Sequence, residues 1–327
     1  MSYKSLIKKN QIVITSFQER LNNFIETQHM FNKVNKKNCL VSIKKNENEY
    51  EYHIQDGIII LKERIGSNSK YGIIYLTTNE INKKIFATKI TLINDYNYLE
   101  ILLAQQLSDI SSKNLSPHFI FIYKILYCYN NFKDENIPKL IKKNNYYISI
   151  NEFLNGTFKN FLELKLSYEY IFNAFQQIMI AILSFHYFTG GMYHNDCHYN
   201  NFLFLKIKPG GYFHYKLFNN NYYVKNMGYL WFIWDFGLIS AEPYYKNQRI
   251  KDYFRIIYFF NLDLPILKRI KNIINYIQSY EKDYEYNFGS SDKIFFEKFI
   301  FDNKILLTKF PKSSKIINKI PYIINDF

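Results

Sequence analysis

The chain has few of the residues that build disulfide frames, turns and flexible linkers: 3 cysteines, 7 prolines and 11 glycines in 327 residues. Three scattered cysteines are too few for a disulfide framework or a zinc site, which favours a reducing compartment. The 48% of apolar residues excludes a largely disordered protein. No apolar run reaches the roughly 18 residues of a membrane span, and no signal-peptide stretch follows the N-terminus. We therefore expect no membrane partner.

Alanine and arginine are also scarce, with 5 of each, whereas tyrosine and phenylalanine number 31 and 30. The scarce residues have GC-rich codons, and the abundant lysine, asparagine, isoleucine, tyrosine and phenylalanine have AT-rich ones. The bias is therefore typical of an AT-rich genome. The net charge is +14, from 42 basic and 28 acidic side chains, but the lysines are scattered. A solvated lysine-rich surface is the favoured interpretation, and a nucleic-acid or other anionic partner is the alternative.

The length suits one large domain or two lobes, with enough interior for a core. Near the N-terminus, apolar residues recur at roughly helical spacing, which predicts a helical extension over residues 1–56. Short apolar segments bounded by turn residues follow, with one helical pattern from about Tyr96 to Ser111. Residues 57–153 are therefore expected to form a lobe built on an antiparallel sheet.

The second half opens with a strong helical pattern from Ser167 to Thr189, which two glycines end. We expect residues 154–327 to form a mainly helical lobe, so that the fold is α+β with the chemistry between the lobes. The aromatic-rich residues 208–228 are expected to form a hairpin packed on this lobe. A platform on which nucleic-acid bases stack is the alternative for that segment.

The most specific chemical signal is the sequence HNDCHYNNFL, residues 194–203, followed by WDFG, residues 234–237. Phosphoryl transfer needs a carboxylate near the attacking hydroxyl and oxygen-bearing side chains that hold Mg²⁺ on the phosphates. Asp196 supplies the first, and Asn201 and Asp235 supply the second. Each fragment alone is unspecific, but both in this order after a long amphipathic helix indicate this chemistry.

A segment rich in glycine and small polar residues lies between two predicted strands, where backbone N–H groups can approach phosphate oxygens. It comprises Ile65, Gly66, Ser67, Asn68, Ser69, Lys70, Tyr71, Gly72, Ile73 and Ile74. Further along, Lys89 stands in an otherwise apolar strand, and a buried ammonium needs an anionic partner. Glu100 is the candidate, because it shares a helix face with apolar residues, and Asp95 is the rival.

Together these motifs resemble the eukaryotic-type protein kinase superfamily, and they look closest to divergent serine/threonine kinases of large and giant DNA viruses. The resemblance covers about residues 57 to 262. It implies a bilobal kinase fold and transfer of the γ-phosphate of ATP to Ser/Thr hydroxyls of proteins, with Mg²⁺. It also implies a location on the cytoplasmic side of a host cell or in a virion.

In this resemblance Asp196 is the catalytic carboxylate, and Asn201 and Asp235 are the metal ligands. Lys89 holds the phosphates and is paired to Glu100. The glycine-rich residues 65–74 would cover the nucleotide.

Two further positions match the family. Glu152 lies in the segment that resembles the hinge beside adenine, and Asp252 resembles the buried aspartate that anchors the catalytic loop.

Other positions depart from the family. Asn195 replaces the arginine that binds a phosphorylated activation loop, so switching by loop phosphorylation is not expected. His198, a further candidate catalytic residue, replaces a lysine. Only 14 residues separate Gly237 from Asp252. The last two features favour the alternative of a small-molecule kinase of the aminoglycoside or choline type, and a kinase-fold scaffold or virion protein is the third hypothesis.

Overall fold

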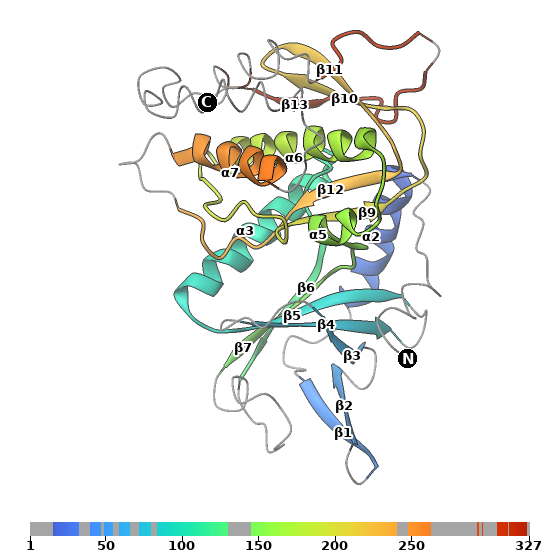
Figure 1. Ribbon diagram of the computed structural model, residues 1–327. Coiled ribbons are helices and arrows are strands. Elements are labelled where there is room, and N and C mark those ends of the chain that lie inside the picture. The colour runs from blue at the N-terminus through green and yellow to red at the C-terminus, as the bar shows by residue number, and fades with distance from the viewer. Residues whose placement is uncertain are drawn as a thin grey trace. The chain divides into compact units, whose positions relative to one another are not determined.

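The computed structural model describes residues 16–32, 40–46, 49–54, 59–65, 72–79, 84–129, 145–240, 248–262, 293, 296, 306–312 and 314–325. The chain divides into two compact units (Figure 1). Unit 1 comprises Met1–Ile12, Gln18–Ser112 and Ile120–Leu154, and unit 2 comprises Val13–Phe17, Lys113–Phe119 and Asn155–Phe327. Both units contain helices and strands, so the fold is mixed α+β.

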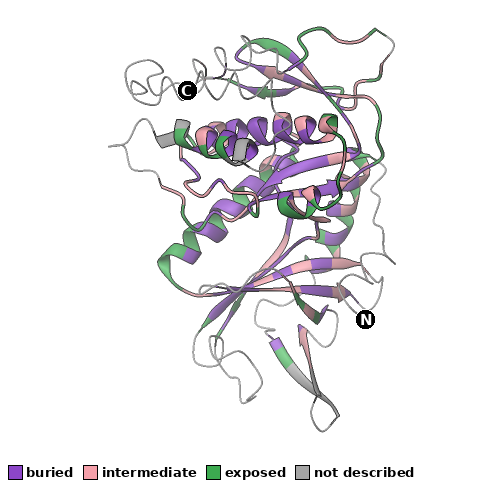
Figure 2. Ribbon diagram, viewed as in Figure 1, coloured by how far each residue is buried: buried purple, intermediate pink, exposed green. Residues whose placement is uncertain are grey.

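Unit 1 is built on a seven-stranded sheet in the order β1-β2-β3-β4-β5-β7-β6, in which all neighbours are antiparallel. The strands are β1 (Leu40–Asn46), β2 (Glu49–Ile54), β3 (Ile59–Ile65), β4 (Gly72–Asn79), β5 (Ile85–Leu92), β6 (Ile122–Cys128) and β7 (Tyr146–Glu152). Every residue of β7, which lies between β5 and β6, is buried, so both of its faces are covered (Figure 2). In β5 the burial alternates, so Phe86 and Ile90 enter the core while Lys89 lies on the opposite face.

Among its described residues this unit has two helices, α2 (Phe17–Asn32) and α3 (Asp95–Ser112). Buried side chains recur along α2 at helical spacing, and two of them are Phe24 and Phe31. Phe24 stacks on Phe121 with ring centroids 4.3 Å apart, and Phe31 meets Phe86 edge to face.

The prediction of a helical extension over residues 1–56 is wrong for its second part, because β1 and β2 begin the sheet. The sequence of β2 explains this, since Tyr50, Tyr52 and Ile54 alternate with polar residues at the period of a strand. Residues 1–15 lie outside the described part of the chain.

In its described residues, unit 2 combines three helices with two three-stranded sheets. The helices are α5 (Phe158–Leu162), α6 (Tyr168–Phe188) and α7 (Gln248–Leu262). One sheet has the order β12-β9-β8, formed by β8 (Gly156–Thr157), β9 (Phe202–Lys206) and β12 (Tyr229–Ile233). The other has the order β11-β10-β13, formed by β10 (Tyr212–Leu217), β11 (Asn220–Lys225) and β13 (Tyr322–Ile324).

The prediction that residues 154–327 are mainly helical is therefore wrong for the described part of this unit. Alternating aromatic and polar residues in β10 and β11 favour strands, and the two strands form the hairpin expected within residues 208–228. Its two turn residues, Phe218 and Asn219, have φ of 47° and 71°, the left-handed backbone that a tight two-residue turn requires.

Helix α6 is the core helix of unit 2, since its described side chains are buried on nearly every face. By length and composition it is also apolar enough to cross a membrane. About 78% of its apolar window is buried inside the protein, as is usual for a core helix.

The cysteines differ from the expectation of three reduced thiols. Cys197 is free and buried, but Cys128 at the end of β6 is disulfide-bonded. Its partner lies outside the described residues.

Candidate active site

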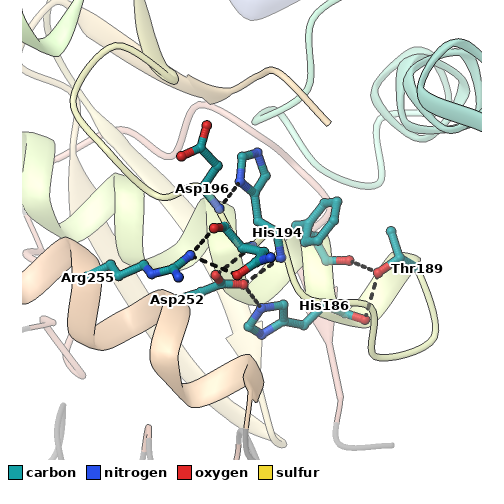
Figure 3. Close-up of polar contacts among 8 residues, drawn as sticks. His186, Thr189, His194, Asp196, Asp252 and Arg255 are labelled. Atoms are coloured by element: carbon teal, nitrogen blue, oxygen red, sulfur yellow. Dashed lines mark hydrogen bonds and ion pairs between the residues drawn. The ribbon is translucent and has the colours of Figure 1, made fainter. Parts of the chain in front are cut away.

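A loop between α6 and β9 carries the motif around Asp196, and α7 fixes its backbone. The carboxylate of Asp252 on α7 accepts hydrogen bonds from the N–H of His194 at 2.6 Å and of Asn195 at 2.9 Å (Figure 3). The Nε2 atom of His186, near the end of α6, lies 3.1 Å from the same carboxylate. Asn195 has φ of 63°, a strained value for a residue other than glycine, and the two adjacent N–H bonds hold it there.

Asp252 is almost fully buried, with 1% of its surface exposed. Burial alone would raise the pKa of this carboxyl, but the hydrogen bond and charge of His186, together with the hydrogen bond from the His194 N–H, outweigh burial and lower the pKa. Asp252 is therefore an ionised anchor that holds the loop in one conformation, as the resemblance implied.

The His194 side chain holds the backbone of the loop at Asp196. Its ring is buried among aromatic rings, and burial lowers its pKa, so the imidazole is neutral. Nε2 lies 3.0 Å from the carbonyl oxygen of Trp234, and Nδ1 accepts the N–H of Asp196 at 3.3 Å. These two contacts require the tautomer with the proton on Nε2. The ring thus ties the Asp196 backbone to the end of β12.

The carboxylate of Asp196 points away from the anchor Asp252 (Figure 3). The side-chain N–H₂ of Asn201 donates to both the backbone oxygen and Oδ2 of Asp196, each at 2.9 Å. His198 Nε2 lies 3.3 Å from the same Oδ2. The Asp196 side chain remains 32% exposed, so it is positioned from two sides and still open to a ligand.

The second predicted metal ligand lies beside the first in the sheet. Phe202 pairs with Ile233, and the N–H of Trp234 donates to the carbonyl of Asn201 at 2.9 Å, which places Asp235 one residue beyond. Asp235 has φ of 66°, a second strained backbone position in this site. The ring of the following residue, Phe236, is buried and stacks on Phe185 of α6 with ring planes within 2°.

Asn195, which stands where the resemblance leads us to expect an arginine, is bound by an arginine from another element. Nη1 of Arg255 on α7 donates to the backbone oxygen of Asn195, and the same atom lies 3.1 Å from its Oδ1. Arg255 lies one helical turn after Asp252, so the two side chains of α7 hold one residue through its N–H and its oxygens.

In unit 1, the ion pair expected between Lys89 and Glu100 is present, with Nζ 2.5 Å from Oε1. Glu100 lies on the buried face of α3, with side-chain exposure of 9% against 16% for Lys89. The rival Asp95 is exposed at the start of the helix. The pair therefore links β5 to α3.

The predicted nucleotide-binding segment is described in part. Ile65 ends β3, and Gly72, Ile73 and Ile74 begin β4, whereas residues 66–71 lie outside the described part. A Cβ at Gly72 would lie 2.7 Å from Cγ2 of Thr91, so glycine here lets β4 approach β5 closely.

Glu152, the predicted hinge residue, does not present its carboxylate to a ligand. Its two oxygens bind Arg20 of α2 at 2.7 and 2.6 Å, and Oε2 also accepts the N–H of Phe121 at 3.2 Å. The Arg20 guanidinium lies 3.9 Å from the centroid of the Phe121 ring. Sequence reasoning missed Arg20, although a charged residue on the apolar face of a helix signals a buried partner.

The donor set of the loop fits a cation such as Mg²⁺. The Asn201 amide nitrogen is used by Asp196, which leaves its oxygen as the ligand atom, and Asp235 follows on the adjacent strand. Among the described residues no group of three or more His, Cys, Asp or Glu side chains could hold a metal by itself. An Mg²⁺ ion held by the oxygens of Asn201 and Asp235 would take its remaining ligands from water or from phosphates.

The structure thus brings Asp196, Asn201, His198 and the Asp235 turn together in unit 2, and Lys89 with Glu100 in unit 1. Comparisons with family models and with curated proteins find no match to this chain.

Proposed function

We propose that the protein is an ATP- and Mg²⁺-dependent protein kinase of the eukaryotic type, which transfers the γ-phosphate to Ser/Thr hydroxyls. The observation that carries the proposal is the loop of unit 2. Its half-exposed carboxylate, Asp196, is oriented by Asn201, on a backbone fixed by the buried Asp252. The bilobal kinase arrangement is part of this proposal.

In the proposed reaction, Asp196 accepts a hydrogen bond from the attacking hydroxyl and takes its proton as the bond to the γ-phosphorus forms. The bond from this phosphorus to the β–γ bridging oxygen breaks, and ADP leaves with the electron pair. The oxygens of Asn201 and Asp235 would hold Mg²⁺, which when bound neutralises charge on the phosphates. Lys89 would contact phosphate oxygens, and Glu100 keeps its ammonium directed. Most of the rate enhancement would come from positioning and charge stabilisation.

A small-molecule kinase is the second candidate, and the His198 contact favours it. An imidazole 3.3 Å from Oδ2 of Asp196 stands where protein kinases have lysine. The segment between Gly237 and Asp252 is also short, with 14 residues, so a platform for an extended peptide would be reduced. A kinase-fold scaffold that binds nucleotide without transferring phosphate is the third candidate function.

The test is transfer of labelled phosphate from ATP by the full chain, in the presence of Mg²⁺, to itself, to a peptide array, and to aminoglycosides, choline and sugars. Asp196→Asn should lower the rate about 10²- to 10⁴-fold, because the general base is lost. Asp109→Asn, an equal change at an exposed position of α3, is the control. Equal rates for wild type and Asp196→Asn would contradict the proposal, and label on a small molecule alone would favour the second candidate.

A further inference from the structure

The sheet formed by β10, β11 and β13 has two chemically different faces. One face is apolar and buried: Phe213, Tyr215 and Leu217 of β10 are at most 1% exposed, and Tyr222 and Val224 of β11 are buried beside them. These side chains pack into unit 2, as expected for the aromatic residues of this segment. The other face is thus left to alternate residues.

The outward face carries aromatic rings flanked by lysines. The facing pairs across the hairpin are Tyr212 with Lys225, His214 with Tyr223, and Lys216 with Asn221. The His214 and Tyr223 rings stack with centroids 4.8 Å apart and planes within 20°. His214 Nε2 lies 2.9 Å from Oδ1 of Asn221, which fixes the imidazole. Each of these six side chains is half-buried or exposed. At the hairpin end Asn219 and Asn220 are exposed, whereas the turn residue Phe218 is buried.

Residues 306–312 and 314–325, which include β13 and are here called the strap, contact both edges of the β10–β11 hairpin. Leu307 accepts the N–H of Tyr223 at the β11 edge, at 2.8 Å, and Lys315 accepts the N–H of Tyr212 at the β10 edge, at 2.8 Å. Phe310 packs on the rings of Tyr212 and Tyr223. The strap adds exposed lysines at Lys309, Lys312, Lys315 and Lys319.

The hairpin segment and the strap together are more strongly positive than the lysine content of the whole chain would explain. Residues 208–228 and 306–325 contain seven lysines and no aspartate or glutamate. The whole chain has 28 acidic residues in 327, so an average stretch of 41 residues would contain between three and four acidic residues. An AT-rich genome explains the abundant lysines but not the absence of aspartate and glutamate from these two segments.

We infer that this outward face binds single-stranded nucleic acid. Lysines would neutralise backbone phosphates, and the half-exposed rings of Tyr212, His214 and Tyr223 would contact bases, because every base offers a flat π surface. An acidic peptide would use the lysines but has no need of the rings. The inference does not depend on kinase activity.

The experiment measures anisotropy of a labelled 20-nucleotide single strand with the full chain over a range of salt. Lys216→Gln with Lys225→Gln should weaken binding and make the slope of log K against log salt shallower by about 1.4, since two phosphate contacts are lost. Lys113→Gln with Lys159→Gln, at exposed positions of other segments, is the matched control and should bind as wild type does.

A second double variant, His214→Leu with Tyr223→Leu, keeps apolar cover but removes the flat rings. It should bind about tenfold more weakly with an unchanged salt slope. The proposal is overturned if this variant binds as tightly as wild type, or if polyglutamate of equal charge competes as well as unlabelled oligonucleotide. It is also overturned if the control substitutions at Lys113 and Lys159 weaken binding of the single strand as much as those at Lys216 and Lys225 do. Asp196→Asn should bind as wild type does, so a failure of the kinase proposal would be seen separately.

Discussion

The two units stabilise their buried carboxylates in different ways. In unit 1, Glu152 and Glu100 each face a cationic side chain, Arg20 at 2.6 Å and Lys89 at 2.5 Å. In unit 2, Asp252 is held by two backbone N–H groups and by His186. Arg255, which lies three residues after Asp252 and is exposed, binds Asn195 instead.

This difference separates structural from site-forming roles. A cation–carboxylate pair connects two elements, α2 to β7 or β5 to α3, and sets no backbone angle of its own. A carboxylate that accepts consecutive N–H groups fixes the φ and ψ of the loop that supplies them. Loss of Arg20 should therefore cost stability, whereas loss of Asp252 should also change the conformation of the loop that carries Asp196.

The largest expected effect tests the first half of the comparison. Arg20→Met removes the cation and leaves the Glu152 carboxylate buried, which should lower the free energy of unfolding by about 3–5 kcal/mol. Chemical denaturation of the full chain measures it. The double variant Arg20→Met with Glu152→Met should regain much of the loss, since no charge remains buried. A single variant as stable as wild type would show that the pair is not buried in solution.

Asp252→Asn tests the second half. The amide keeps the shape but loses the charge that accepts the N–H groups of His194 and Asn195, so stability should fall by about 2 kcal/mol. Hydrogen exchange at these two amides should become faster relative to the amides of α6. Phosphate transfer per folded molecule should fall as well, which Arg20→Met should not cause. If both amides stayed as protected from hydrogen exchange as in wild type, Asp252 would not fix the loop backbone, and the proposed difference between the two units would be wrong.

Sequence patterns predicted the local elements of both units better than their assembly. The strands β4, β5, β7, β9 and β12 and the helices α3 and α6 follow apolar periodicity that nearby residues fix. The strands β1 and β2 were missed because the helical pattern of the N-terminal residues was extended across them, although β2 alternates at the period of a strand. The two sheets of unit 2 were underestimated because β13 pairs with β10 more than a hundred residues away, and that pairing depends on tertiary contacts.

In the candidate site, too, contacts between nearby residues could be predicted and contacts between distant residues could not. The Lys89–Glu100 pair could be predicted, since Glu100 shares a helix face with Leu103 and Leu107. The partners of Glu152 and Asn195 could not, because Arg20 and Arg255 lie 132 and 60 residues away in sequence. No periodicity joins residues at such separations, and only the folded chain selects them.

The smallest expected effect concerns pH and sharpens the comparison, because His194 lies beside the anchor of unit 2 while Arg20 stays charged at every pH. Burial lowers the pKa of His194 in the folded protein, and the unfolded value is about 6.5. As pH falls below that value, the unfolded chain binds a proton that the folded chain refuses, so stability falls. One proton changes the free energy of unfolding by at most about 1.4 kcal/mol per pH unit.

Asp252 acts in a separate range, because its lowered pKa gives a contribution that is present above the ordinary value of 3.8 and is lost only as pH falls through the lower folded value. Denaturation at pH 7.5, 6.5, 5.5 and 4.5 should therefore report His194. His194→Phe keeps an aromatic ring beside Phe185 and Phe236 and should flatten the slope between pH 6.5 and 4.5. His29→Phe, at an exposed position of α2, should keep the wild-type slope. If His194→Phe kept that slope too, the acid sensitivity would lie outside the loop, and the anchored region of unit 2 would be no more pH-dependent than the ion pairs of unit 1.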